Sequence, residues 1–402
     1  AQLMEGVVVT ARDARTVEFK LEEAYAPFLA YLTVGILPEH LLGDLDADGL
    51  YNAAFNAQPT GTGPYRVKGR SREGVVLEAN TTYHFGPPHI STIEFRMVAD
   101  EGGLVASLRS GDIDGALFGP DAEAAELKLL RDDSRFTLQE LTGTSSNMVY
   151  FDTRSALFND VAVRGALVQA VNPQSLIDSA AAGRGEPTDT GIPVASWAHA
   201  DVAGLGFSPG AAARAREIAG WSRGRDGVRR KGDLRLSFGL STSNDSARAA
   251  IAEDVARQWR AVGAEVVVYR LDAATYIQQF LLPRAFQTAL VEIDPGPDPD
   301  PYPFWHSSQV ADPGRNLAGF SSSQLDDVLQ RARQNTDMAR RKELYEDFAT
   351  FLIAGSPAVP LYAPVSTYVQ RNDVRGFDAS LLFSPASRFS NAYEWYIKTR
   401  VR

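Results

Sequence analysis

A stretch rich in aspartate and proline, residues 293–308, holds the side chains whose types and spacing best suit contact with a ligand. It reads IDPGPDPDPYPFWHSS and contains five prolines. Proline fixes φ and has no backbone N–H to donate, so the segment is expected to form a stiff loop and not a helix or a central strand. A stiff loop suits binding because little conformational entropy remains to be lost.

Five side chains of this loop are candidates for ligand contact: Asp294, Asp298, Asp300, Tyr302 and Trp305. The carboxylates can accept hydrogen bonds from an ammonium group or from hydroxyls, and the aromatic rings offer flat apolar faces. The alternative is a purely structural loop whose aspartates cap turns.

His306 lies in the same loop and raises the question of metal binding or catalysis. The histidines stand at positions 40, 84, 89, 199 and 306, with no HxxxH or HExxH spacing. There is also no GxSxG nucleophile motif, although a Ser–His–Asp triad assembled by the fold stays open as an alternative. We therefore expect no metal site, no cofactor and no enzymatic activity, with a hydrolase as the less favoured reading.

Two further segments resemble binding motifs more weakly. Trp197, in the turn-like sequence PVASWAH, would either stack on a ligand or seal the protein surface. The sequence TGTGPY at 60–65 has the glycines of a phosphate loop, but it leads into an expected strand and not into a helix. We read it as a tight turn.

The elements that must position these residues follow from hydrophobic periodicity. Strand–helix–strand–helix–strand patterns are expected over residues 91–141 and 234–293, with Ser243 or Asn244 capping the first helix of the later one. Such crossovers give parallel strands covered by helices, so two α/β lobes are expected. Ligands of open α/β sheets bind beyond the carboxyl ends of the strands, which is where we expect the site.

Composition excludes several classes of protein. The chain of 402 residues is 44% hydrophobic and 22% charged, as in a soluble globular protein of two or three domains. It has no cysteine, which removes disulfides and thiolate sites, and its net charge of −10 argues against nucleic-acid binding. A basic run at 223–231 is read as a solvated loop, and no apolar stretch is long enough to span a membrane.

Six segments, in this order along the chain, resemble the family 5 extracellular solute-binding proteins, the peptide- and nickel-binding components of ABC importers. They are TVEFKLEEAYAPFLAYLTVGILPEHLL from 16, PTGTGPYRV from 59, LEANTTYHFGPPHISTIEFRMVAD from 77, FNDVAVRGALVQAVNPQSLID from 158, GPDPDPYPFWHSS from 296, and the segment from 321 that ends in PAVPLYAPV. The resemblance covers nearly the whole chain.

The resemblance implies a fold and a role. The fold is two-lobed and of the periplasmic-binding-protein type, each lobe a mixed sheet covered by helices. Residues 1–40 are then a remnant of a small accessory domain and the return to lobe one, 41–141 are lobe one, 142–374 are lobe two, and 375–402 return to lobe one. The hinges are expected near 141–150 and 374–377.

The implied role is to deliver a small ligand, most simply an oligopeptide, to the permease subunits of an ABC transporter outside the cytoplasm. The implied location is either the periplasm or the outer face of the cell membrane, and the only membrane association expected is through a lipid anchor, which this chain would have lost. A receptor or scaffold of the same fold that takes no part in transport is the alternative. The family's further N-terminal stretch does not precede the first hairpin, so the first strand of lobe one is expected to be missing.

The resemblance also implies site residues. Asp294 is the nearest match to the aspartate that holds a peptide's α-ammonium group, and Arg284 is the available candidate for its carboxylate. The family's usual Gly-Trp before the acidic loop is replaced by Glu292 and Ile293. This change removes an aromatic wall next to the ligand.

Overall fold

The computed structural model describes residues 6–378 and 381–398. The chain forms two compact units, the first made of Ala1–Leu32 and Thr144–Pro364, the second of Thr33–Gly143 and Val365–Arg402. The sequence-based division into lobes at 40, 141 and 374 stays a prediction. None of the helices in the described residues combines the length and apolar character that crossing a membrane requires.

Unit one contains most of the regular structure. Its strands are β1 (Val8–Asp13), β2 (Thr16–Lys20), β8 (Ser146–Phe151), β9 (Gly185–Pro187), β10 (Ser222–Arg223), β11 (Arg229–Lys231), β12 (Leu234–Arg235), β13 (Ser237–Ser243), β14 (Glu265–Leu271), β15 (Thr288–Ile293) and the first half of β16 (Ala358–Arg371). Its helices are α1 (Phe28–Tyr31), α6 (Val161–Gln169), α7 (Pro173–Ala180), α8 (Pro209–Ile218), α9 (Ser246–Ala261), α10 (Ala273–Thr275), α11 (Tyr302–Trp305), α12 (Ser323–Gln334) and α13 (Met338–Gly355).

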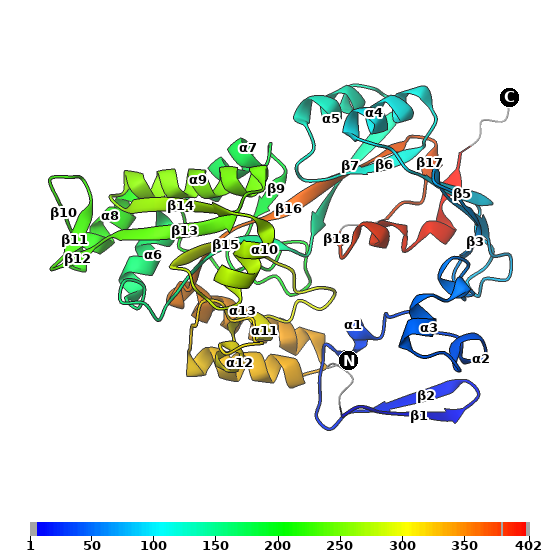
Figure 1. The fold of residues 1–402 in the computed structure, drawn as a ribbon, viewed down its shortest axis with the longest axis horizontal. Coiled ribbons are helices and arrows are strands. Elements are labelled where there is room, and N and C mark those ends of the chain that lie inside the picture. The colour runs from blue at the N-terminus through cyan, green and yellow to red at the C-terminus, as the bar shows by residue number, and fades with distance from the viewer. Residues whose placement is uncertain (1–5, 379–380, 399–402) are drawn as a thin grey trace. The chain divides into compact units, whose positions relative to one another are not determined.

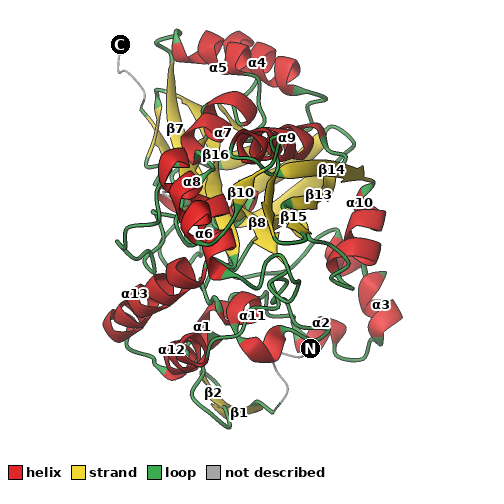
Figure 2. Cartoon of the chain, turned by 90° about the vertical axis from the view of Figure 1, so that its left-hand side faces the viewer, coloured by secondary structure: helices red, strands yellow, loops and turns green. Residues whose placement is uncertain are grey.

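The main sheet of unit one has the strand order β14-β13-β15-β8-β16. Strands β14 and β15 lie parallel to β13 on its two sides, which confirms the later of the two predicted units. Strands β8 and β16 then add antiparallel to their neighbours. Helix α9 covers one face of these strands, and α11, α12 and α13 lie on the other (Figures 1 and 2).

The predicted helix cap before α9 is wrong by one or two residues. Asp245 is the N-cap, and its carboxylate accepts a hydrogen bond from the Arg248 amide at 3.0 Å. Ser243 is still the last residue of β13, and the Asn244 amide donates to Leu271 O at 2.7 Å. The strand therefore continues past the point where periodicity placed its end.

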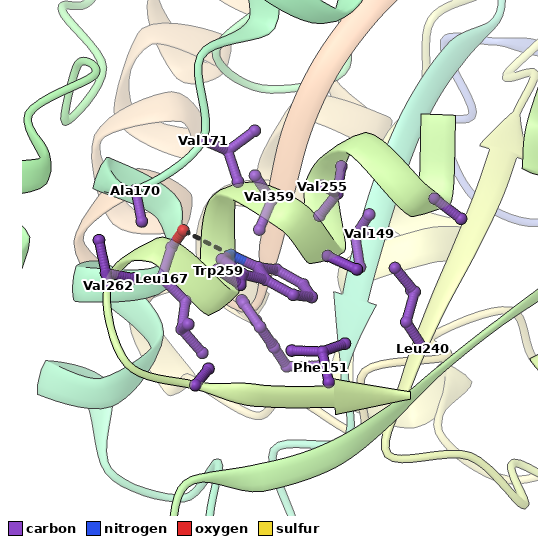
Figure 3. Close-up of a cluster of buried hydrophobic side chains, with 14 of the residues drawn as sticks. Val149, Phe151, Leu167, Ala170, Val171, Leu240, Val255, Trp259, Val262 and Val359 are labelled. Atoms are coloured by element: carbon purple, nitrogen blue, oxygen red, sulfur yellow. Dashed lines mark hydrogen bonds between the residues drawn. The ribbon is translucent and has the colours of Figure 1, made fainter. Parts of the chain in front are cut away.

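Trp259 of α9 lies at the centre of the larger core of unit one (Figure 3). Its side chain is fully buried, and its indole N–H donates to Leu167 O of α6 at 3.0 Å. Phe151 of β8 and Phe238 of β13 pack against the ring, with centroids 6.0 and 5.4 Å away. One side chain thus joins two helices to the sheet.

Unit two is built around the second half of β16. Its strands are β3 (Tyr65–Arg70), β4 (Gly74–Ala79), β5 (Thr92–Arg96), β6 (Gly115–Phe118), β7 (Phe136–Gly143), β17 (Val374–Arg375), β18 (Leu381–Leu382) and β19 (Tyr396–Ile397), and its helices are α2 (Glu39–Leu42), α3 (Ala47–Tyr51), α4 (Glu101–Ser110) and α5 (Ala124–Arg131).

The earlier of the two predicted strand–helix units is wrong in its pairing. Strand β5 belongs to a separate antiparallel sheet with β3 and β4. Strands β6 and β7 do not pair with each other, because β16 pairs antiparallel with both. The intervening strand comes from more than 200 residues further along the chain, so a local pattern cannot reveal it.

Strand β16 serves both units. Within unit one, its residues pair with β8, from Ala358 opposite Tyr150, and with β9. Within unit two, residues 365–371 pair with β7, and four of these residues also pair with β6. Every one of these ladders is antiparallel, and each unit completes its sheet with part of this strand.

Replacement of Trp259 by alanine is expected to lower the free energy of unfolding by about 3–5 kcal/mol, because it leaves a large cavity and an unpaired Leu167 carbonyl. Urea titration followed by far-UV circular dichroism measures this. Lys342→Ala, at an exposed position of α13, serves as the control and should change stability by less than about 0.5 kcal/mol. Equal losses in the two variants would contradict the central role of Trp259.

Candidate functional site

The acidic proline loop that follows β15 is held down by two ion pairs. Asp298 receives two hydrogen bonds from Arg341 of α13, at 2.8 and 2.7 Å. Asp300 receives two from Arg333 of α12, at 2.9 and 2.8 Å. Arg341 contacts both oxygens of Asp298, a bidentate geometry that is strong and specific, whereas both Arg333 bonds reach the same oxygen of Asp300. Side chains therefore fix the loop to the helices. The prediction that residues 293–308 contain no helix is wrong near their end, where Tyr302–Trp305 form α11, because Pro303 lies in the first turn of that helix and proline is tolerated there.

The Asp298–Arg341 pair is removed from solvent, whereas in the second pair Asp300 is buried and the Arg333 side chain is 24% exposed. Asp298 is 9% exposed and Arg341 is 4% exposed, while Asp300 is 5% exposed. Burial raises the pKa of Asp300, and the charge and hydrogen bonds of Arg333 partly offset that rise. An unpaired charge at such depth is costly, so each carboxylate depends on its guanidinium partner.

Trp197 completes the surroundings of Arg341. The guanidinium lies 4.9 Å from the centre of the Trp197 ring and 5.5 Å from that of Tyr345. It also donates to the Tyr345 hydroxyl at 2.8 Å. The sequence offers two roles for Trp197, stacking on a ligand or sealing the protein surface. Its contact with Arg341 fits the second role. Its role in ligand contact stays a prediction.

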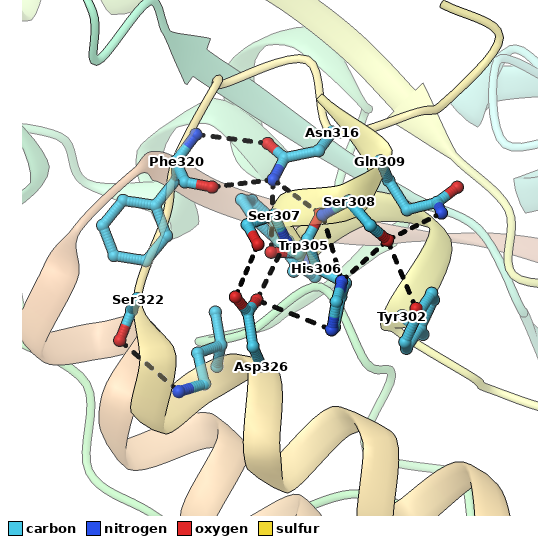
Figure 4. Close-up of polar contacts among 11 residues, drawn as sticks. Tyr302, Trp305, His306, Ser307, Ser308, Gln309, Asn316, Phe320, Ser322 and Asp326 are labelled. Atoms are coloured by element: carbon cyan, nitrogen blue, oxygen red, sulfur yellow. Dashed lines mark hydrogen bonds and ion pairs between the residues drawn. The ribbon is translucent and has the colours of Figure 1, made fainter. Parts of the chain in front are cut away.

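Tyr302 lies in a column of flat groups. The Arg333 guanidinium is 3.8 Å from the centre of its ring, and the His306 ring stacks on it at 4.1 Å. Its hydroxyl lies 3.2 Å from Ser308 Oγ (Figure 4). The Tyr302 ring is thus in contact with both the Arg333 guanidinium and the His306 imidazole.

The fold does bring a serine and a histidine of the loop close to an aspartate of α12, Asp326. Ser308 Oγ is 2.8 Å from His306 Nδ1, but His306 Nε2 is 3.9 Å from Asp326 Oδ1, which is longer than a hydrogen bond. His306 Nδ1 also accepts from the Ser308 amide at 3.1 Å, as the N-cap of a short helical turn. Asp326 instead accepts from the amide and hydroxyl of Ser307, at 2.8 and 2.6 Å. Local capping accounts for this cluster (Figure 4).

Trp305 belongs to the second core of unit one. Its side chain is 1% exposed and stacks on Tyr150 of β8 with a centroid distance of 5.2 Å. Arg284 closes a turn: its backbone has φ of 57°, and its guanidinium donates to Leu282 O at 2.9 Å and Gly314 O at 2.6 Å. Neither side chain lies beside Asp294 in the contacts of the described residues.

A cluster of polar groups lies at the carboxyl ends of the parallel strands of unit one. Glu292, near the end of β15, accepts from Arg248 in the first turn of α9 at 2.5 Å and from the Ser145 hydroxyl at 2.7 Å. Because β8 is antiparallel to β15, Ser146 at the start of β8 pairs with Ile293 at the same edge. We call this set the strand-end cluster, with Arg248, Glu292, Ser145 and Asp294 as its charged and hydroxyl members.

Asp294 is the predicted site residue that lies in this cluster. Its side chain is exposed, and its Oδ1 accepts from the Thr144 hydroxyl at 2.7 Å and from the Gly296 amide at 2.9 Å. Within residues 6–378 and 381–398, its Oδ2 atom makes no hydrogen bond. An ionised carboxylate has about four acceptor positions, so Asp294 retains capacity for an external donor.

Two buried hydroxyls mark the same edge. The side-chain oxygens of Ser146 and Ser243 have no partner among the described residues, although Ser146 is 0% and Ser243 is 8% exposed. A buried polar atom left unsatisfied costs about 1–3 kcal/mol, so such atoms are uncommon without a reason. Ser146 begins the antiparallel β8 and Ser243 ends β13, so both lie at the edge of the sheet where a ligand is expected.

Sequence reasoning missed Arg248, and it treated Glu292 only as a departure from the family pattern. The two residues lie 44 positions apart in the chain, so no local motif joins them. The available signal was topological, because Glu292 stands near the carboxyl end of a strand and Arg248 stands in the first turn of a helix. In the described part of the chain, no three His, Asp or Glu side chains gather in a way that would hold a metal ion.

The family model described as bacterial extracellular solute-binding proteins, family 5 middle, matches residues 2–312. The chain belongs to this family. Family 5 consists of solute-binding proteins and not of enzymes.

Curated relatives agree with the family assignment. This family 5 chain is 31% identical over 352 residues to Protein XP55 of Streptomyces lividans, covering 86% of the chain and 62% of that protein. It is 26% identical over 375 residues to the oligopeptide-binding protein AppA of Bacillus subtilis, covering 91% of the chain and 67% of AppA. The chain thus spans about two thirds of the length of these relatives.

Solved structures share the fold. NikZ from Campylobacter jejuni, in complex with Ni(L-His), has 25% identity and a TM-score of 0.73, with 98% of this chain and 79% of that one covered. AppA from Bacillus subtilis, in complex with a nonapeptide, has 24% identity and a TM-score of 0.71, with 99% and 79% covered. The predicted fold class, a two-lobed family 5 type with mixed sheets covered by helices, is confirmed.

Replacement of Asp298 by alanine is expected to lower the free energy of unfolding by about 3–5 kcal/mol, because it leaves the Arg341 charge buried and unpaired. The double variant Asp298→Ala with Arg341→Met should lose less than Asp298→Ala alone, since no charge then remains. Chemical denaturation curves for the three proteins measure the difference.

The matched control is Asp327→Ala, which removes the partner of Arg331 in a pair whose side chains are 63% and 47% exposed on α12. That loss should stay within about 1 kcal/mol. A double variant as unstable as the single Asp298 variant would show that the pair does not act through charge.

Proposed function

We propose that this chain is the ligand-binding body of an extracytoplasmic solute-binding protein that delivers a small ligand, an oligopeptide or a similar molecule, to the permease subunits of an ABC importer. Family membership supports the class of function, and several relatives are named as peptide-binding proteins of ABC transporters. A lipid anchor at the outer face of the cell membrane fits the same role.

The observation that carries the ligand proposal is the strand-end cluster. It presents one carboxylate with spare acceptor capacity, Asp294, beside an arginine–glutamate pair whose side chains are 33% and 32% exposed. Opposite charges held a short distance apart complement a zwitterion. A peptide has both an ammonium and a carboxylate, as well as amides that suit the neighbouring hydroxyls.

The roles within the cluster follow from its contacts. Thr144 and the Gly296 amide hold Asp294 through one oxygen, so its other oxygen is left for the ligand's ammonium group. Arg248 has Glu292 as its partner and would exchange part of that contact for a ligand carboxylate. This proposal transfers the anion-binding role from Arg284 to Arg248, because Arg284 already donates to two carbonyls in its own turn.

Peptides with a free amino terminus are expected to bind more tightly than their N-acetylated counterparts, by about tenfold or more, because acetylation removes the cation that Asp294 would hold. In Asp294→Asn that preference should disappear. Thermal-shift screening of short-peptide pools on the full chain identifies binders, and calorimetric titration of one binder in both forms gives the comparison. A ligand at 100 times its Kd should add about 2.7 kcal/mol of stability.

Asp347→Asn, an exposed carboxylate of α13, is the control and should retain the preference for free amines. If peptide pools and Ni(L-His) all fail to stabilise the chain, solute transport loses its support and a receptor or scaffold role gains it. If peptides bind equally well with and without acetylation, Asp294 is not the ammonium site.

A further inference from the structure

Unit one contains a pocket of about 140 Å³ that the proposed function does not use. Helix α6 contributes Val168 to its wall, and the end of α13 contributes Leu352 and Ile353. Met148 of β8 and Pro360 of β16 form the side towards the sheet. Neither Asp294 nor any other member of the strand-end cluster lines it, so the pocket is a separate feature of the unit.

The size of the pocket limits what it can hold. A dry apolar cavity of about 150 Å³ accommodates one benzene molecule. The pocket has nearly this volume, and its walls are mostly aliphatic side chains and prolines with the Trp305 ring. A single ring or a branched alkyl group of similar bulk therefore fits, whereas a second ring does not.

One acidic group, Asp189, breaks the apolar lining. Its side chain lines the pocket and is also exposed, which places it at the mouth. In the part of the chain that the structure describes, it forms no ion pair. Loss of hydration raises its pKa, and the charge of His199 and the Gly204 backbone lower it in part. A partly dehydrated carboxylate of this kind is stabilised in its charged form by a cation placed close to it.

The segment 204–207 forms the rest of the mouth and holds the carboxylate close. A Cβ atom added at Gly204 would lie only 1.9 Å from Asp189 Oδ1, so any other residue at this position would displace the carboxylate. Leu205 and Phe207 line the pocket and are still 38% and 48% exposed. The mouth thus combines a carboxylate that forms no ion pair among the described residues with apolar side chains that a ligand would cover.

From this geometry we propose that the pocket binds a primary amine with one compact apolar body, about the size of a benzene ring, whose ammonium group pairs with Asp189. The apolar body fills the space between α6 and α13, and the ammonium stays at the mouth. The site is distinct from the strand-end cluster and does not depend on the proposed transport function.

Three probes that share one ring but differ in charge test the proposal: benzylamine, benzyl alcohol and benzoate. Each is titrated into the full chain at pH 7 and followed by NMR chemical shifts or by calorimetry. Benzylamine is expected to bind about tenfold more tightly than benzyl alcohol, and benzoate most weakly. Methylamine, which has the charge but not the ring, should bind at least about tenfold more weakly than benzylamine, because most of the apolar contact is lost.

Asp189→Asn should reduce benzylamine affinity to that of benzyl alcohol and leave benzyl alcohol unchanged. Asp201→Asn, which removes an exposed carboxylate from the same connecting segment, is the matched control and should have no effect. Val168→Phe, which fills the pocket, should weaken both ligands, and the Asp189 comparison remains decisive if that variant does not fold.

The proposal is overturned if the three ring probes bind equally, if none binds at millimolar concentration, or if benzylamine binding survives Asp189→Asn. It is equally overturned if Asp201→Asn weakens benzylamine as much as Asp189→Asn does, since that would indicate attraction to the net charge of the chain. Loss of peptide binding in Asp294→Asn has no bearing on this result, so failures of the two proposals can be told apart.

Discussion

The buried pair between Asp298 and Arg341 is the interaction on which the arrangement of unit one depends most. The loop after β15 has five prolines and therefore few amides with which to join a sheet. Side chains must hold the loop instead. Asp300 and Asp298 do so through the guanidinium groups of arginines on α12 and α13. Once these contacts fix the loop, Asp294 at its start has a defined position beside the strand ends.

This anchoring separates three aspartates that look alike in the sequence. Asp298 and Asp300 are buried and paired with arginines of the fold. Asp294 is exposed and has one oxygen without a partner among the described residues. The distinction rests on Arg333 and Arg341, which lie 33 and 43 positions further along the chain. A negatively charged loop thus has a neutralised interior and a single charged end that is available to solvent.

Much of the fold could be predicted because local patterns decide it. The helical spacing of Ile251, Val255 and Trp259 predicts one buried face, and all three are in the core. The prolines after Ile293 predict a loop, which residues 294–301 form, but the prediction fails at Tyr302–Trp305, which form α11. The strand pairing of unit two could not be predicted, since β6 and β7 are joined only through β16. The Arg248–Glu292 contact is equally non-local, and for the same reason it left no motif.

The sharing of β16 has a consequence for how the protein forms during synthesis. Its partners β6, β7, β8 and β9 all lie before residue 188, whereas β16 begins at Ala358. A ribosome making this chain must add about 170 residues or more after those strands before either sheet can close, and contacts of such sequence separation form slowly. Until then the exposed edges of β7 and β8 are open to wrong partners. Neither unit can therefore complete its sheet before this one strand has been made.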